Sequence, residues 1–127
     1  MRPPRFSLTF EQEGVTSDFL KVSKLTLRGG TGHKLDTYDV GTNVPELSFV
    51  RGASEPRQSD GRTWRSFDSP TTIALTDAQT LDSYSGFEIE CRPQTTETPL
   101  RITSHGEIQN IVTVTSNKWQ TLNFSLQ

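Results

Sequence analysis

The chain has 127 residues, a formal net charge of −2 at pH 7 and a hydrophobic fraction of 31%. This length suits a single domain covering residues 1–127 and leaves little room for a second one. Because the charge is nearly neutral and the basic residues are scattered, the composition lacks the electrostatic footprint of a nucleic-acid-binding protein. No basic amphipathic stretch and no apolar run of ~18 residues points to a membrane. We therefore expect neither nucleic acid nor a membrane as a partner.

Aromatic content argues that this polar chain still has a core. Seven Phe, two Trp and two Tyr accompany the low hydrophobic fraction, and disordered chains are poor in such residues. Thr, Ser, Gln and Asn would hydrate the outer face of a sheet whose inner face is packed. The composition thus favours an all-β protein, an antiparallel β-sandwich or jelly roll of about 8–10 strands.

The first third of the chain predicts two strands. Apolar residues alternate with polar ones over residues 6–10 and predict a strand that ends at residues 11–14. A second strand is predicted over Phe19–Leu27, but its apolar residues change parity halfway. One extra residue reverses the facing of all that follow, so we expect a β-bulge near Ser23 and Lys24.

The middle of the chain is less regular. Residues 28–33 predict a turn, residues 51–62 a surface loop, and residues 76–82 one helical turn at most. Short strands are expected at 35–40, 47–50, around Trp64 and Phe67, and at 73–75.

The last forty residues predict four strands. Two are expected at 87–92 and 100–103, followed by a turn at His105 and Gly106. The other two are joined by the turn residues Ser116, Asn117 and Lys118, which predicts an antiparallel pair closing the sandwich. The expected inward residues of this pair are Val112, Val114, Leu122, Phe124 and Leu126. The expected outward residues are Thr113, Thr115, Asn123 and Ser125.

Catalytic motifs are not evident, so we predict that the protein is not an enzyme. A cupin-type metal site needs several clustered His ligands, whereas His33 and His105 are the only two in the chain. The sequence has no Gly-x-Ser-x-Gly nucleophile elbow, and the glycine-rich run after Arg28 leads into a strand rather than a helix. Cys91 is the only cysteine, so no intrachain disulfide forms and we expect a buried thiol.

Aromatic rings outside the core could bind sugars by stacking on their apolar faces. Trp64 follows the predicted loop, and Tyr38 and Tyr84 have polar neighbours. We therefore predict a platform of these three rings, although each could instead be a core or anchoring residue. Trp119 is expected to pack at the start of the last strand. The polar partners that we assign to the platform are Arg51, Asp60 and His33.

Two carboxylates near the end of the first strand offer a possible metal site. Glu11 and Glu13 are two residues apart and could supply oxygen ligands to a structural Ca²⁺. The alternative is that both are ordinary solvated charges.

Three segments resemble the β-jelly-roll carbohydrate-binding modules, the galactose-binding-like sandwiches attached to bacterial polysaccharide-degrading enzymes. They are Phe6–Glu13, Gly86–Cys91, and Val112–Leu126 with its Trp at the start of the last strand. The resemblance implies a lectin-like, non-catalytic module that binds a polysaccharide or oligosaccharide, often with a structural Ca²⁺ in relatives. It matches no particular family motif, and a shared fold does not by itself establish function.

Three hypotheses follow. The first is a monomeric carbohydrate-binding module of a larger secreted enzyme. The first four residues hold no apolar signal-peptide core. We therefore expect a signal peptide to be absent or already removed. The second is a structural or adhesion β-sandwich of a surface, appendage or viral protein that binds a protein partner. The third is a small β-fold lyase or hydrolase with two facing carboxylates.

Overall fold

The structure, a computed structural model, describes residues 6–14, 18–29, 34–42, 47–59, 61–75, 84–94, 97, 99–104 and 108–126. It does not describe the side chains of residues 6, 34–36, 50 and 51. The predicted helical turn at 76–82 and the predicted turn at His105 and Gly106 lie outside the described residues.

Every regular element in the described part of the chain is a β-strand, and all strand pairs are antiparallel. The prediction of an all-β antiparallel sandwich is therefore confirmed. The strands are β1 (Phe6–Gln12), β2 (Leu20–Arg28), β3 (Lys34–Asp39), β4 (Leu47–Ala53), β5 (Arg57–Ser59), β6 (Arg62–Leu75), β7 (Gly86–Pro93), β8 (Pro99–Ser104), β9 (Ile108–Thr113) and β10 (Gln120–Ser125).

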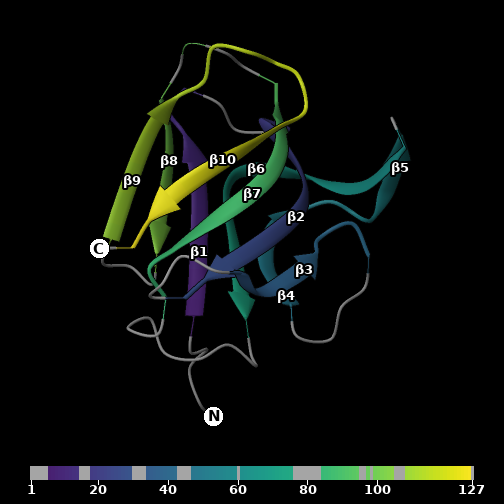
Figure 1. Ribbon diagram of the computed structural model, residues 1–127. Helices are drawn as coiled ribbons and strands as arrows, with labels where there is room; N and C mark the ends of the chain where they lie inside the picture. Colours follow the sequence, from purple (N-terminus) through teal and green to yellow (C-terminus); the bar gives the residue numbers. More distant parts are fainter. Residues whose placement is uncertain are drawn as a thin grey trace.

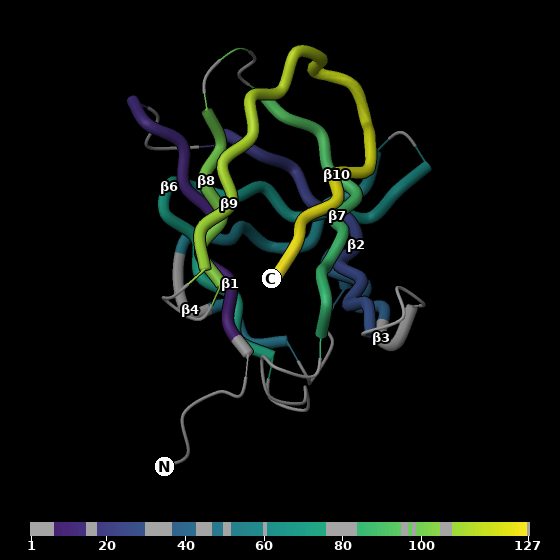
Figure 2. Tube along the Cα trace, turned by 60° about the vertical axis from the view of Figure 1, so that its left-hand side comes forward, coloured from purple at the N-terminus to yellow at the C-terminus, as the bar shows by residue number. Residues whose placement is uncertain are grey.

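The strands form two facing layers that share β6 (Figure 1). The hydrogen-bonded order is β10-β7-β2-β6-β1-β8-β9, with β3 added to β2, and β4 and β5 added to β6. The first half of β6 pairs with β2 and β5, and its second half pairs with β1. We call β3, β2, β7 and β10 the β2–β7 layer, and β4, β1, β8 and β9 the β1–β8 layer. Figure 2 shows the two layers on either side of the molecule.

The core lies between the layers and is built from the inward residues of each strand. In the β2–β7 layer, Leu25 lies opposite Ile89, and Ile89 lies opposite Leu122. The rings of Phe87 and Phe124 stack with their centroids 5.0 Å apart. These contacts follow from the period of two, which sends alternate side chains to the same face.

The predicted bulge is present in β2. The pairing of β2 with β7 shifts between Val22, which lies opposite Cys91, and Lys24, which lies opposite Glu90. Ser23 is the extra residue and is buried. Because of the insertion, Val22 and Leu25 both face the core although they are an odd number of residues apart.

The predicted closing pair is wrong in its pairing but right in its facing. β9 pairs with β8 and β10 pairs with β7, so the two strands lie in different layers. They approach each other across the open side, where the Asn110 side-chain amide donates to the Ser125 carbonyl at 2.9 Å. An alternating pattern determines which way a side chain faces, but it does not determine which strand is the neighbour. The burial alternates as predicted: Val112, Val114, Leu122, Phe124 and Leu126 are buried or half-buried, and Thr113, Thr115, Asn123 and Ser125 are exposed.

The prediction of a surface loop at 51–62 is wrong, because strands occupy much of this range. β4 extends to Ala53, and β5 forms a hairpin with the start of β6. Every residue of β5 is exposed, so the strand carries no apolar alternation that a sequence pattern could detect. The two short strands that were expected around Trp64 and after Pro70 are one continuous strand, β6.

Arg65 explains why the pattern of β6 is hard to read. Its side chain is buried next to the buried Trp64, which breaks the alternation. The guanidinium donates to the carbonyls of Val40 at 2.9 Å, Ser54 at 2.9 Å and Thr42 at 3.3 Å, and it lies 4.4 Å from the centroid of the Phe49 ring. Buried donors need such partners, so this cation holds two connecting segments against β6.

Substitutions in β10 test the observed facing. Phe124→Ala should lower the free energy of unfolding by about 3–5 kcal/mol, because a buried ring is lost from the core. The adjacent Asn123→Ala should change it by no more than about 0.5 kcal/mol, because that side chain is exposed. Urea unfolding of both variants measures the difference, and equal losses would contradict this register.

Candidate functional site

The three rings predicted to form a binding platform are buried. Tyr38 is 5% exposed and Tyr84 is 2% exposed, and both belong to the main core cluster. Trp64 is 7% exposed. The predicted surface exposure of these rings is therefore wrong. The polar neighbours that suggested a surface position, such as Thr37 and Asp39 beside Tyr38, are themselves exposed because they alternate with the inward ring.

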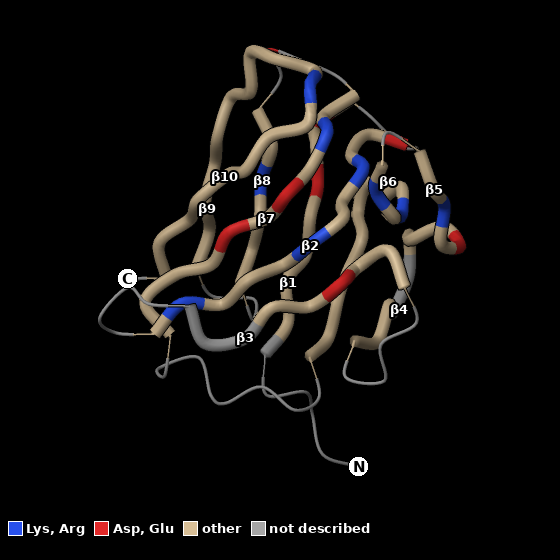
Figure 3. The backbone as a smooth tube through the Cα atoms, turned by 45° about the vertical axis from the view of Figure 1, so that its right-hand side comes forward, with Lys and Arg blue, Asp and Glu red and all other residues tan. Residues whose placement is uncertain are grey.

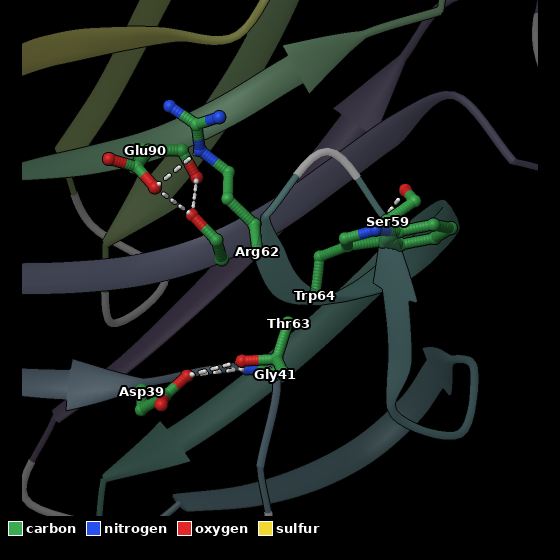
Figure 4. Close-up of polar contacts among 8 residues, drawn as sticks. Asp39, Gly41, Ser59, Arg62, Thr63, Trp64 and Glu90 are labelled. Carbon is green, nitrogen blue, oxygen red and sulfur yellow. Dashed lines mark hydrogen bonds and ion pairs between the residues drawn. The ribbon is translucent and has the colours of Figure 1, made fainter.

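Trp64 is covered by the β5 hairpin and by a lysine. Its indole N–H donates to Ser59 Oγ at 2.8 Å, as Figure 4 shows. The Lys21 ammonium lies 4.4 Å from the centroid of the Trp64 ring, a cation–π contact. Together these contacts leave little of the ring open to a ligand.

The predicted polar partners of the platform cannot be placed around it. Arg51 lies in β4 opposite Thr72, but its side chain is not described. Asp60 and His33 lie outside the described residues. Trp119, expected to pack at the start of the last strand, is half-buried, and the Arg62 guanidinium lies 4.9 Å from the centroid of its ring.

Glu11 and Glu13 line a hollow of about 380 Å³ at the end of β1. Arg101 lies opposite Glu11 on β8 and lines the same hollow. Ca²⁺ takes six to eight oxygen ligands, mostly carboxylates and carbonyls. The described residues contain no group of three or more side chains able to hold a metal ion. The Arg101 guanidinium, which shares the hollow with Glu11 and Glu13, is a cation and cannot be a metal ligand.

Chelation tests this point directly. We expect EDTA to leave the melting temperature unchanged, because a ligand raises stability only if the native state binds it. Differential scanning calorimetry with and without EDTA, followed by added Ca²⁺, is the measurement. A melting temperature that falls in EDTA and recovers with Ca²⁺ would show that the predicted metal site exists.

A different surface gathers polar side chains from four strands. The outer face of the β2–β7 layer carries two rows across β3, β2, β7 and β10. One row is Asp39, Lys24, Glu90 and Thr121, and the other is Thr37, Thr26, Glu88 and Asn123. Figure 3 shows the acidic and basic residues of this layer along β2, β3 and β7. We call these eight residues the polar face.

A hollow of about 230 Å³ lies in the polar face. Carboxylates, hydroxyls and one ammonium group line it, from Lys24, Thr26, Thr37, Glu88, Glu90 and Thr121. The hydroxyl oxygens of Thr26 and Thr37 are 3.2 Å apart and share a hydrogen bond. The Arg28 guanidinium donates to Glu88 at 2.5 Å. The walls of the hollow are therefore held in place by bonds between neighbouring strands.

The Glu90 carboxylate is held by two side-chain donors. Its Oε1 accepts hydrogen bonds from Ser23 Oγ at 2.6 Å and from Arg62 Nε at 3.0 Å. The Ser23 hydrogen bond is the largest cause of a lowered Glu90 pKa; partial burial opposes it, and the charges of Arg62 and Lys24 add to it. Each of these donors favours the ionised carboxylate. Figure 4 shows Arg62 reaching Glu90 from β6.

Asp39 closes one end of the polar face. Its Oδ1 accepts from the Gly41 N–H at 3.2 Å and from the Thr63 hydroxyl at 3.4 Å, as Figure 4 shows. A Cβ atom at Gly41 would lie 2.1 Å from the Thr63 carbonyl carbon, so this close approach to β6 requires glycine.

Two neighbouring ionisable groups of β7 have pKa values that are shifted in opposite directions. A glycosidase general acid needs a carboxyl group with a raised pKa, whereas the pKa of Glu90 is lowered. Cys91 lies behind the sheet and is fully buried, as predicted. Burial, with a contribution from the Glu90 charge, raises the pKa of its thiol to about 12. Such a thiol is not a nucleophile at neutral pH.

None of the eight residues of the polar face is aromatic, so a prediction based on exposed rings did not include them. The outward positions of the strand predicted at 87–92 are Glu88 and Glu90, and those after the bulge are Lys24 and Thr26. The signal was therefore present in the alternation. The meeting of these residues depends on the pairing of β2 with β7, which the sequence pattern does not specify.

Comparison with models of known protein families, with curated protein sequences and with solved structures finds no significant match. In the part of the chain that the structure describes, no helix has the length and hydropathy of a membrane span.

The pH dependence of stability tests the environment of Glu90. Its pKa is lowered in the folded protein, so the ionised group stabilises the fold above its unfolded pKa of about 4.3. That contribution is lost as the pH falls through the folded-state pKa. The melting temperature of Glu90→Gln should lie below that of the wild type at about pH 7, and the difference should shrink towards about pH 3. The exposed Glu55→Gln is the control, and a difference for Glu90→Gln that does not change with pH would contradict this account.

Proposed function

We propose that the protein is a non-catalytic carbohydrate-binding module that holds a polysaccharide or oligosaccharide on its polar face. The observation that supports this proposal is the hollow of about 230 Å³, lined by both hydrogen-bond acceptors and donors. Sugar hydroxyls donate and accept at once, so they need both kinds of partner close together. The carboxylates accept, the lysine ammonium donates, and the threonine hydroxyls do either.

The proposal moves the binding surface away from the predicted rings. Tyr38 and Tyr84 belong to the core, and Trp64 is covered by the β5 hairpin and Lys21. The outward residues of the β2–β7 layer would meet the ligand. The fixed geometry favours binding, because side chains that are already ordered lose little freedom when a ligand arrives. The resemblance to modules of secreted polysaccharide-degrading enzymes supports secretion, and a place within a larger protein, as parts of the same proposal.

A second candidate, a structural or adhesion domain with a protein partner, has one observation in its favour. Ile111 on β9 is 61% exposed and is the one large exposed hydrophobic residue among those described. A protein interface usually involves a contiguous apolar patch of several hundred Å². One isoleucine beside Glu11 and Arg101 is weaker support than the hollow in the polar face.

A glycan array followed by affinity electrophoresis tests the proposal. Thr37 is exposed and lines the hollow, so Thr37→Arg should block the hollow and weaken retention at least about tenfold, a loss of about 1.4 kcal/mol in binding free energy. Thr113 is exposed on β9, in the other layer, and Thr113→Arg is the matched control. Absence of binding to any glycan, or equal retention of both variants, would contradict the proposal.

A further inference from the structure

We infer that the polar face selects neutral glycans and binds two adjacent sugar hydroxyls between Glu90 and Lys24. Ser23 and Arg62 are positioning residues that hold the Glu90 carboxylate. This inference rests on the proposed function and specifies its ligand class. It is carried by three features of the described residues, namely the arrangement of bonds at Glu90, the position of Lys24, and the balance of charge around the hollow.

The bonds at Glu90 leave one carboxylate oxygen for a ligand. Ser23 and Arg62 both donate to Oε1. Figure 4 shows the other oxygen, Oε2, pointing away from Arg62, and no described residue bonds to it. The Glu90 side chain is 27% exposed and lines the hollow. An ionised carboxylate oxygen only accepts hydrogen bonds, so this position selects a ligand group that donates.

Lys24 supplies the complementary donor. It lies directly opposite Glu90 on the neighbouring strand, is exposed, and lines the same hollow. Side chains directly opposite each other on neighbouring strands have Cβ atoms about 4.5–5.5 Å apart. An ammonium group donates and cannot accept. Two neighbouring hydroxyls on a sugar ring match this pair, since one donates to Glu90 and the other accepts from Lys24.

The charge around the hollow argues against an acidic ligand. Arg28 is bonded to Glu88 and Arg62 to Glu90, so these two cations are already engaged with carboxylates. Lys24 is the one cation among the described residues that line the hollow, and it lies between Asp39 and Glu90 on the neighbouring strands. A sulfate or uronate group in the hollow would approach the carboxylates of Glu88 and Glu90. Like-charge contacts of this kind exclude a ligand rather than bind it.

Ser23 and Arg62 hold the Glu90 carboxylate in place. The bulge buries Ser23 and places its hydroxyl against Glu90. Arg62 is bonded to Glu90 and also lies over the Trp119 ring, which restrains the guanidinium on a second side. Neither residue lines the hollow, so both would act through Glu90.

Glycan arrays that include neutral, uronic-acid and sulfated polysaccharides test the ligand class. We expect retention on neutral glycans and at least about tenfold weaker retention on their charged counterparts, about 1.4 kcal/mol. Retention only on uronic-acid or sulfated glycans would overturn this inference and leave the proposed function standing. Retention on none of them would overturn the proposed function itself.

Substitution of the pair tests the residues. Glu90→Gln and Lys24→Met should each weaken binding to the best neutral ligand at least about tenfold by isothermal titration calorimetry. Glu55→Gln and Lys118→Met remove the same charges at exposed positions outside the hollow and should bind like the wild type. Thermal melting confirms that each variant is folded at the temperature used. Unchanged affinity in either Glu90→Gln or Lys24→Met would overturn the assignment of the pair.

The role of Ser23 has a signature in the pH profile. Ser23→Ala removes the main cause of the lowered Glu90 pKa, so Glu90 should take up a proton at a higher pH. The pH at which affinity falls by half on the acid side should therefore rise, whereas Thr113→Ala should leave it unchanged. A purely structural role would reduce affinity without moving this midpoint, and an unmoved midpoint would overturn the positioning role.

Discussion

The bulge at Ser23 is the constraint on which the rest of the structure depends. Side chains in a strand alternate with a strict period of two, so a single inserted residue reverses the facing of everything that follows. If Ser23 were paired as in a regular strand, with no bulge, Lys24 and Thr26 would point into the core and Leu25 would point to solvent. With it, β2 gives its leucines to the core and its polar residues to the outer face, opposite the carboxylates of β7.

The long strand β6 makes the two layers into one structure. It leaves the β2–β7 layer after pairing with β2 and continues beside β1 in the other layer. The Arg65 guanidinium donates to three backbone carbonyls and so holds two connecting segments against β6. On the opposite side, the layers meet through the contact of Asn110 with Ser125. The polar face is thus supported by a sheet that is anchored along one side by a shared strand.

Local patterns predicted facing well and pairing poorly. The alternation in β10 correctly assigned Phe124 to the core and Asn123 to solvent, because facing depends only on the period of the strand. The neighbour of β10 depends on the path of the whole chain. The turn-like residues Ser116, Asn117 and Lys118 before β10 therefore did not determine its pairing. The error over the tyrosines has a different cause. The polar neighbours of Tyr38 indicate a strand with one hydrated face, and the ring belongs to the opposite, buried face.

The candidate site could be anticipated only in part, for the same reason. Glu88 and Glu90 stand at outward positions of a strand that the sequence predicted, and the bulge was predicted beside Ser23. Ser23 and Glu90 are, however, 67 residues apart in the chain, and only the antiparallel pairing of β2 with β7 brings them together. No local periodicity encodes such a contact, because periodicity describes one strand at a time.

The hydrogen bonds and the ion pair around Glu90 contribute more to the position of its carboxylate than to the stability of the fold. Partly exposed ion pairs such as Arg62 with Glu90 contribute little to folding, about 0–1 kcal/mol for pairs at the surface. A hydrogen bond to a charged group contributes about 1.5–3 kcal/mol. An apolar residue at position 23 could fill the bulge without needing a partner. The chain instead buries a hydroxyl that donates to one oxygen of the Glu90 carboxylate, while the other oxygen points away from Arg62. Under the proposed function, that arrangement would give a ligand a fixed acceptor on an otherwise hydrated sheet face.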